Sequence, residues 1–534
     1  MNDMIATNSM GFPTLSLIMF LPTIGAVALL FFKEHQTEAM KKFALVISVI
    51  TFIISLRLLI NFDSETHLFQ FVEKVPWIES YGISYFIGVD GISLLLIILT
   101  TLVTAIVILA SWTDIKHKVK AYMILFLVLE TGVLGVFMAL DLFLFYVFWE
   151  VMLIPMVFII GVWGGARRIY ASMKFFIFTF LGSVFMLLGI LTIYFYHGKV
   201  TGNYTFDVTI LYNTKIPADF QFWIFLSFLL GLAVKVPMFP LHTWLSDAHT
   251  EAPTGGSVIL AGLLLKLGPY GFFRFGVPLL PDASISFAPL MIFLSIIAIV
   301  YGAWVAIAQK DMKKLIAYSS VSHMGFITLG LFVFNQKGWE GSLLQMVNHG
   351  ISTSGLFLLI GIIYERTHDR MIGSYTGLFN KMPVYAVFFL IIMLSSMGLP
   401  VTNGFIGELY ILMGAFESSW VLSLLAVTGI LFGAVYLLWL FQRIFLGEFK
   451  CKIEGLKDLS VRECAVFVPF LVLIFWIGLY PKPFLKTMNK SLHHFLQKVE
   501  TKESVAGLSD DLNKVNSVSN KVSALSFEGS EERI

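Results

Sequence analysis

The chain has 534 residues, of which 57% are hydrophobic and 13% are charged, and its formal net charge is +2. Soluble domains carry about a quarter charged residues, so this composition excludes an ordinary soluble protein. The near-neutral charge gives no reason to expect a nucleic-acid partner. The two cysteines, Cys451 and Cys464, are fewer than the roughly four thiolates of a usual iron–sulfur cluster. With no glycine-rich phosphate-binding motif either, the sequence predicts no metal and no cofactor in this chain.

Apolar segments of roughly 20 residues, each long enough to cross a bilayer, recur along the chain. We count about fourteen of them, which predicts an all-α polytopic membrane protein. The first, about residues 12–32, lacks the basic start and cleavage site of a signal peptide and is expected to be retained. The polar stretch 499–534 is predicted to be disordered. The segments are centred near Leu21, Ile50, Ile98, Gly132, Val151, Gly182, Leu229, Leu265, Ile297, Ile327, Leu356, Met397, Leu431 and Leu473.

Lysine and arginine are distributed unequally between the loops. If the N-terminus faces outward, the inward loops hold about nineteen of these residues and the outward loops about five, as the positive-inside rule requires. The sequence therefore predicts a multi-pass protein of a bacterial inner membrane with both termini outward. The inward set is Lys33, Lys41, Lys42, Lys116, Lys118, Lys120, Arg167, Arg168, Lys310, Lys313, Lys314, Arg366, Arg370, Lys381, Arg443, Lys450, Lys452, Lys457 and Arg462, and the outward set is Lys74, Lys199, Lys215, Arg274 and Lys337.

Two of the segments contain prolines near their middle. The seventh has KVPMFP at 235–240, and the twelfth has GLPVTNG at 398–404. Proline removes a helical N–H group and clashes with the preceding turn, so both helices are predicted to break inside the membrane. Paired breaks five spans apart indicate two inverted five-helix repeats around an ion pathway, although simple proline kinks are an alternative. The predicted units are 1–120 (helices 1–3), 121–280 (first repeat, helices 4–8), 281–450 (second repeat, helices 9–13), 451–498 (last transmembrane helix) and the tail 499–534.

Several ionisable side chains are predicted to lie inside the membrane. A charge there costs at least about 2.5–3.5 kcal/mol, so it needs a partner or a hydrated cavity. Acids and bases alternate along the chain, and a buried lysine beside a movable carboxylate can take or release a proton. The set therefore predicts a proton-transfer path. Structural ion pairs are the alternative, as are hydrogen bonds from His323 to neighbouring serines and from His349 to Asn348. The candidates are Glu150, Lys235, Lys266, His323, His349 and Glu408, with Glu130 as an additional buried acid.

The end of the seventh segment carries four further titratable residues. His242 and His249 could form the mouth of the path or have no role in it. They predict no metal site, because no third ligand is evident nearby. Asp247 and Glu251 are expected to be loop charges.

Four motifs now point to a family. They are DLFLFYVFWE at 141–150, KVPMFPLHTWLSDAH at 235–249, EAPT at 251–254 and AYSSVSHMG at 317–325. Together they resemble the antiporter-like membrane proteins shared by respiratory complex I, Mrp-type antiporters and membrane-bound hydrogenases, over nearly the whole chain except its tail. Ser246 departs from the proline that is common in the family, and the polar tail is longer than expected.

Within that family the chain is similar to the M-type subunits of complex I. Glu408, in NGFIGE at 403–408, stands where L- and N-type subunits carry lysine, and no long lateral helix is expected after the last span. The resemblance implies proton translocation in which the Glu150–Lys235 pair modulates Lys266. Lys266 would then pass protons through His323 and His349 to Glu408.

The same resemblance implies a subunit of an NADH:quinone oxidoreductase that carries no redox centre itself. Flavin, iron–sulfur clusters and quinone are expected in partner subunits. The expected partners are L- and N-type membrane subunits, the lipid bilayer and protons. An Mrp-type cation/proton antiporter, a membrane-bound hydrogenase subunit and a non-conducting scaffold held by buried ion pairs are the alternatives.

Overall fold

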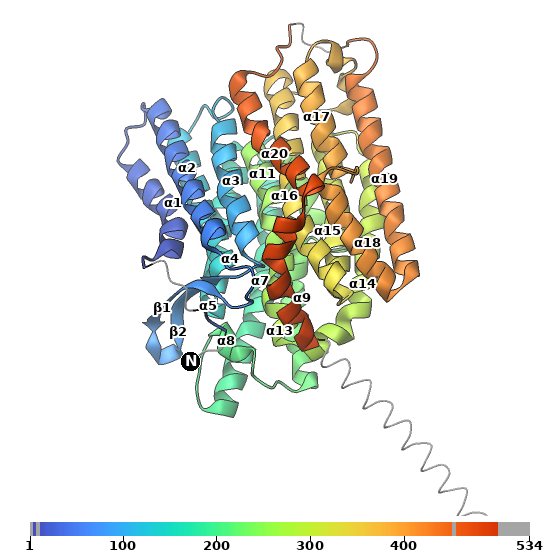
Figure 1. The fold of residues 1–534 in the computed structure, drawn as a ribbon. Helices are drawn as coiled ribbons and strands as arrows, with labels where there is room; N and C mark the ends of the chain where they lie inside the picture. The colour runs from blue at the N-terminus through green and yellow to red at the C-terminus, as the bar shows by residue number, and fades with distance from the viewer. Residues whose placement is uncertain (1–3, 7–10, 451–454, 500–534) are drawn as a thin grey trace, which may run out of the picture.

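The computed structural model describes residues 4–6, 11–450 and 455–499. Within these ranges eleven helices are long and apolar enough to cross a membrane, and α1, α3 and α17 are shorter apolar helices. Figure 1 shows them as a bundle of roughly parallel rods. The predicted multi-pass helical fold is therefore confirmed. The predicted disordered tail, 499–534, lies almost wholly outside the described residues.

The first part of the chain forms one side of the bundle. Here α1 packs against α2 and α4, and α2 packs against α3. The described residues contain one sheet, an antiparallel hairpin of β1 (Gln70–Ile78) and β2 (Ile83–Val89) joined by the short helix η1 (Glu79–Tyr81). The helices are α1 (Thr14–Leu30), α2 (Thr37–Asn61), α3 (Leu94–Ala110), α4 (Val119–Met138), α5 (Leu142–Val151), α6 (Leu153–Trp163), α7 (Arg168–Thr201) and α8 (Val208–Leu211).

The seventh segment breaks where its prolines predicted. Helix α9 (Ala218–Lys235) ends at the lysine itself, the chain is not helical from 236 to 242, and α10 (Thr243–Glu251) follows. The prediction that Asp247 and Glu251 are loop charges is wrong, because both lie in α10. A helix can start there because no proline follows Pro240 until Pro253.

The eighth segment is also irregular, which the sequence analysis did not predict. Pro269 has no N–H to donate to the carbonyl of Leu265. In addition, the Lys266 side chain takes the carbonyl of Ala261, which a regular helix would pair with the Leu265 N–H. The segment consists of α11 (Thr254–Gly262), the 3₁₀ turn η2 (Leu264–Lys266), α12 (Leu267–Gly271), the π-helical turn η3 (Phe272–Gly276) and α13 (Val277–Leu279).

The second part of the chain contains the other predicted break. Helix α17 stops at Ser396 and α18 starts at Asn403, and between them Gly398 and Val401 have φ angles of 77° and 81°. The predicted last unit, 451–498, also divides, because α20 ends at Leu479 and residues 482–499 form a separate helix. The elements are α14 (Pro281–Ile307), α15 (Met312–Phe332), α16 (Gln336–Thr367), η4 (Ile372–Ser374), η5 (Leu378–Asn380), α17 (Pro383–Ser396), α18 (Asn403–Ser418), α19 (Trp420–Phe445) and α20 (Val461–Leu479).

The loops rich in lysine and arginine gather at one end of the bundle, which we call the basic end. The hairpin, α8 and the helix 482–499 lie at the opposite end (Figure 1). Direct contacts join several of these loops to one another, so loops that the charge distribution assigned to one side do lie at the same end of the bundle. These contacts are Lys41 with Trp112, Arg462 with Thr113, Arg366 with Glu463 and Arg370 with Asp311.

The centre of the bundle is formed by three spans that are almost entirely buried. The most apolar windows of the span 254–279, of α15 and of α16 are 100%, 94% and 94% buried, whereas those of α19 and α20 are 33% and 28% buried. The central spans carry Lys266, His323 and His349. Their polar side chains are therefore kept away from the lipid-facing surface.

Candidate functional site

Lys266 lies at the centre of the site. It occupies the 3₁₀ turn η2 and its side chain is completely buried. Its Nζ atom donates to the Ala261 carbonyl and lies 2.7 Å from Nδ1 of His349 on α16. The predicted alternative for His349, a hydrogen bond with its neighbour Asn348, is not what the structure shows. The irregular eighth segment thus presents its lysine directly to an imidazole of the second half of the chain.

Two histidines and an acid continue from this lysine. The rings of His349 and His323 have centroids 5.6 Å apart. His323 Nδ1 lies 3.3 Å from Glu408 Oε1, and its Nε2 lies 3.5 Å from Ser396 Oγ. We call Lys266, His349, His323 and Glu408 the central row. The predicted order, His323 before His349, is wrong, because α16 and not α15 faces Lys266.

Glu408 is held by amide side chains that the sequence analysis did not select. Gln345 Nε2 donates to Glu408 Oε1 at 3.3 Å. Asn348 Nδ2 in turn donates to Gln345 Oε1 at 3.2 Å and to the Asn403 carbonyl at 2.7 Å. Their spacing on one face of α16, together with His349, was a signal in the sequence. The break before Asn403 brings α18 close enough for these bonds to form.

Glu150 and Lys235 form a second, separate pair. Lys235 ends α9 and is 2% exposed, and its Nζ has no hydrogen-bond partner among the described residues. Its Nζ lies 5.4 Å from the ring centroid of Trp149 and 5.6 Å from that of Phe175. Glu150 and Lys235 are near enough to interact electrostatically. However, no ion pair joins them among the residues that the structure describes.

Glu130, the additional candidate, lies apart from both groups. It is 2% exposed on α4, and neither carboxyl oxygen has a hydrogen-bond partner. Within the described part of the chain, no hydrogen bond or ion pair connects it to the other six candidates. The structure therefore gives this buried acid no place in the central row.

The residues at the end of the seventh segment are more strongly fixed than expected. Asp247 pairs with Lys174 at 2.7 Å, and Glu251 is 9% exposed beside Arg370. His249 is completely buried against the ring of Phe357, with centroids 4.7 Å apart. In the part of the chain that the structure describes, neither of its ring nitrogens has a hydrogen-bond partner. These side chains connect the basic end with the interior of the bundle.

A buried ion pair at the opposite end was missed from sequence. Arg274, expected to be an outward loop residue, is 1% exposed in the π-helical turn η3. Its Nη1 donates to Asp90 Oδ2 at 2.9 Å, and Asp90 itself is 0% exposed. Arg274 is the basic residue of an otherwise apolar run, Phe272–Gly276, and that isolation was the available signal.

The acid that begins α5 has a perturbed pKa. Asp141 accepts from the backbone N–H groups of Phe143, Leu144 and Ser84 at 2.9, 3.1 and 3.0 Å. Burial nevertheless raises the pKa of Asp141 to about 6, because desolvation outweighs these bonds. Its cap fixes the start of the helix that carries Glu150.

The central row is suited to moving protons. An imidazole can accept a proton on one nitrogen while donating from the other. A lysine and a glutamate at its two ends provide a donor and an acceptor within 2.7 and 3.3 Å of a ring nitrogen. Within the described residues, no group of three or more His, Cys, Asp or Glu side chains could hold a metal ion.

Comparison with known proteins gives the family. Residues 139–433 match the model of the NADH:quinone oxidoreductase/Mrp antiporter transmembrane family, and residues 16–140 match the amino terminus of NADH-ubiquinone oxidoreductase chain 4. The NADH-quinone oxidoreductase subunit M of Rickettsia typhi is 44% identical over 495 residues, which are 91% of this chain and 99% of the relative. Chain 4 of Marchantia polymorpha is also 44% identical, over 91% of this chain and 97% of its own length.

A solved structure shares the fold. A chain of respiratory complex I from Thermus thermophilus with bound NADH superposes with a TM-score of 0.83 and 33% identity, over 91% of this chain and 99% of that chain. The resemblance drawn from the four sequence motifs is thereby confirmed. The chain belongs to the NADH:quinone oxidoreductase/Mrp antiporter membrane family, and within it to the chain 4, or subunit M, group.

Proposed function

We propose that this chain is the proton-translocating membrane subunit of an NADH:quinone oxidoreductase and that the central row carries the protons. One observation supports this above the others: Lys266, His349, His323 and Glu408 follow one another in the buried core through contacts of 2.7 Å, 5.6 Å between ring centroids, and 3.3 Å. Titratable groups buried inside a membrane protein are expensive and typically mark ion pathways.

In this proposal the Glu150–Lys235 pair controls the central row. Neither charge is neutralised by a close partner, so a small movement of one changes the electrostatic environment of the other. A closer Glu150 would favour a charged Lys235, and a withdrawn one would favour its neutral form. The change at Lys235 would then alter the electrostatic environment of Lys266 in the eighth segment.

The energy for this movement comes from other subunits. Flavin, iron–sulfur clusters and quinone would be held there, as the subunit M names of the relatives suggest. L- and N-type membrane subunits are the proposed neighbours. The apolar faces that α14 and α19 expose, including Trp304 and Leu431 at 59% and 61%, are available for lipid or for such neighbours.

We further propose a topology of fourteen spans. It counts α5 with α6, α9 with α10, α11 to α13 together, and α17 with α18 as one broken span each. Residues 121–280 and 281–450 would be inverted repeats, with the breaks after Lys235 and before Asn403 in corresponding positions. The positive-inside rule places the basic end on the inner side of a bacterial inner membrane and both termini outside.

Affinity purification of the tagged chain from gently solubilised membranes tests this function. We expect subunits that carry flavin and iron–sulfur clusters to co-purify, with NADH-driven quinone reduction in the eluate. Recovery with antiporter subunits alone would instead support an Mrp-type exchanger. Impaired assembly as the first effect of neutralising Lys266 would support a scaffold.

A further inference from the structure

At the basic end, Arg370 joins the loop after α16 to the start of α15. It lies in the loop after α16, where its carbonyl accepts from the Met312 N–H at 3.0 Å. Its Nε donates to Oδ2 of Asp311 at 2.5 Å, and Asp311 caps the start of α15. The backbone and the Nε atom of Arg370 are therefore fixed by residues at the start of α15.

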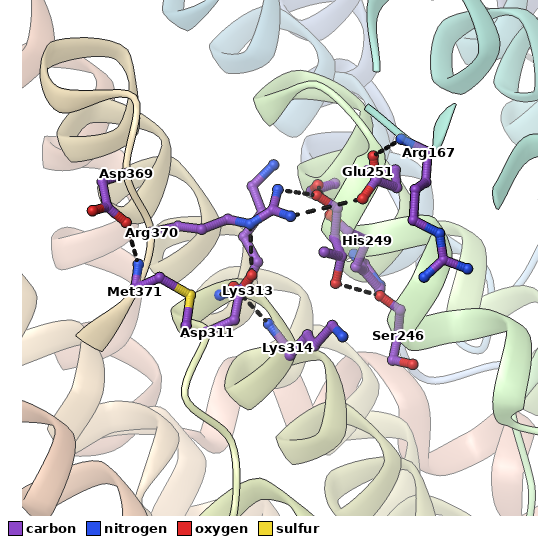
Figure 2. Close-up of polar contacts among 12 residues, drawn as sticks. Arg167, Ser246, His249, Glu251, Asp311, Lys313, Lys314, Asp369, Arg370 and Met371 are labelled. Carbon is purple, nitrogen blue, oxygen red and sulfur yellow. Dashed lines mark hydrogen bonds and ion pairs between the residues drawn. The ribbon is translucent and has the colours of Figure 1, made fainter. Parts of the chain in front are cut away.

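The rest of its guanidinium reaches α10, in the first half of the chain. Nη1 donates to the Thr250 carbonyl at 2.7 Å, and Nη2 lies 3.7 Å from Glu251 Oε1 (Figure 2). The other oxygen of Glu251, Oε2, accepts from the Arg167 N–H at 2.8 Å. One carboxyl oxygen is thus bound to backbone, whereas Oε1 faces the arginine at a distance too long for a hydrogen bond.

Glu251 and Arg370 stand between two cavities. The larger cavity has a volume of about 440 Å³ and is also lined by Arg167, Asp247, Asp311 and Lys314. The smaller cavity has a volume of about 120 Å³ and is also lined by Asp114, His117 and Lys313. Both are large enough to hold water. Thr250, Glu251 and Arg370 line both cavities, so they form the wall between them.

The smaller cavity is lined by groups that can hold protons. Asp114 lies in the loop between α3 and α4, where burial and then the charge of Glu365 raise its pKa above the usual range. Lys313 is 2% exposed and donates to the Ala252 carbonyl at 2.8 Å. His249 is near enough to interact electrostatically with both Lys313 and Lys266. Titratable side chains therefore extend from the wall to the start of the central row.

We propose that Glu251 is the proton-accepting group through which the central row is loaded from the basic end, and that Arg370 is its positioning residue. A proton from water in the larger cavity binds Oε1 of Glu251 and leaves toward water in the smaller cavity, so Glu251 returns to its carboxylate. Arg370 holds the carboxylate in the wall between the two cavities. This inference rests on the proposed function.

Proton pumping by vesicles that carry the whole complex tests the proposal. Because a missing acid–base group slows proton transfer, we expect Glu251→Gln to lower the NADH-driven pumping rate at least about tenfold at neutral pH. Without the guanidinium contacts the carboxylate is no longer held in the wall, so Arg370→Gln should lower the pumping rate severalfold. Arg370→Lys keeps a cation and should restore much of the wild-type rate.

Arg366→Gln is the matched control. Arg366 lies in the last turn of α16, also at the basic end, and pairs with Glu463 at 2.8 Å. Its side chain is 19% exposed, against 23% for Arg370, but it lines neither cavity. We expect its pumping rate to stay that of the wild type. Equal losses of pumping in Arg366→Gln and Arg370→Gln, or wild-type pumping in Glu251→Gln, would overturn the proposal.

Two outcomes remain distinguishable from these. If wild-type vesicles do not pump at all, both the proposed function and this inference fail. If Arg370→Gln does not assemble, as judged by the amount of intact complex, the isosteric Glu251→Gln variant decides the question.

Discussion

The central row and the Glu150–Lys235 pair are built from the same residue types but are held differently. In the row, Lys266 and Glu408 each lie beside a histidine, and backbone or amide groups satisfy part of their hydrogen bonding. In the pair, Lys235 Nζ faces aromatic rings and one oxygen of Glu150 has no partner. The row is thus connected by close contacts except between its two histidine rings, which no hydrogen bond joins among the described residues, whereas the pair interacts only across space.

This difference indicates a division of labour. Proton transfer needs groups within hydrogen-bonding reach, directly or through one water. An electrostatic control element needs the opposite, because charges that are already locked together cannot change their effect on a third group. Variants in the row should therefore stop proton movement, and variants in the pair should change its rate.

The largest effect is expected from Lys266→Ala. Removing the amine interrupts the row at its first contact with His349, so pumping should fall at least about a hundredfold while the complex still assembles. Proton uptake by inside-out vesicles during NADH oxidation measures this. Lys337→Ala is the control, because Lys337 is an exposed lysine that pairs with Glu417. Pumping by Lys266→Ala at the control rate would contradict the row as described.

Glu408→Gln should have the next largest effect. The amide keeps the shape and the bond to Gln345, but it cannot carry a proton to or from His323. We expect pumping to fall about 10- to 100-fold, with NADH oxidation lowered along with it. The same vesicles provide the measurement, and Glu417→Gln is a surface control. If the row ended at His323, this variant would pump normally.

The positions of these residues could be predicted from sequence, but their order could not. A charged residue stands out in an apolar segment, and the motifs KVPMFP and GLPVTNG located the breaks of the seventh and twelfth segments. Whether His349 or His323 faces Lys266 depends on how α15 and α16 rotate against the eighth segment, which no local pattern encodes. The irregular eighth segment was missed because the sequence analysis did not consider Pro269, and because an apolar pattern does not show the bond from the Lys266 side chain to the Ala261 carbonyl five residues earlier.

Glu150→Gln tests the other half of the comparison and should have a smaller effect. It removes the negative charge that acts on Lys235 without removing any contact of the central row. We expect the coupled pumping rate to fall about 3- to 10-fold, because a change of one pKa unit at a proton-exchanging group is a factor of ten. The measurement is the ratio of protons pumped to NADH oxidised, together with the rate. A loss as complete as that of Lys266→Ala would show that the pair conducts protons.

The smallest effect is expected at Asp141, which caps the helix bearing Glu150. Its pKa in the folded protein is about 6, raised by burial from the ordinary 3.8. The folded state therefore binds this proton more tightly than the unfolded state, and its contribution to stability is greatest below about pH 4 and is lost as the pH rises through 6. The difference amounts to about 3 kcal/mol at most.

Asp141→Asn, which resembles the protonated acid, should remove this pH dependence. Hydrogen exchange of the amides of Phe143, Leu144 and Ser84, corrected for intrinsic rates at pH 4.5 and 7, measures it. In the wild type, protection should fall between these pH values, and in the variant it should stay constant. Asp63→Asn, on an exposed loop of the same end, should behave like the wild type. A variant that still lost protection with rising pH would place the titrating group elsewhere, because an amide at position 141 has no proton to lose in this range.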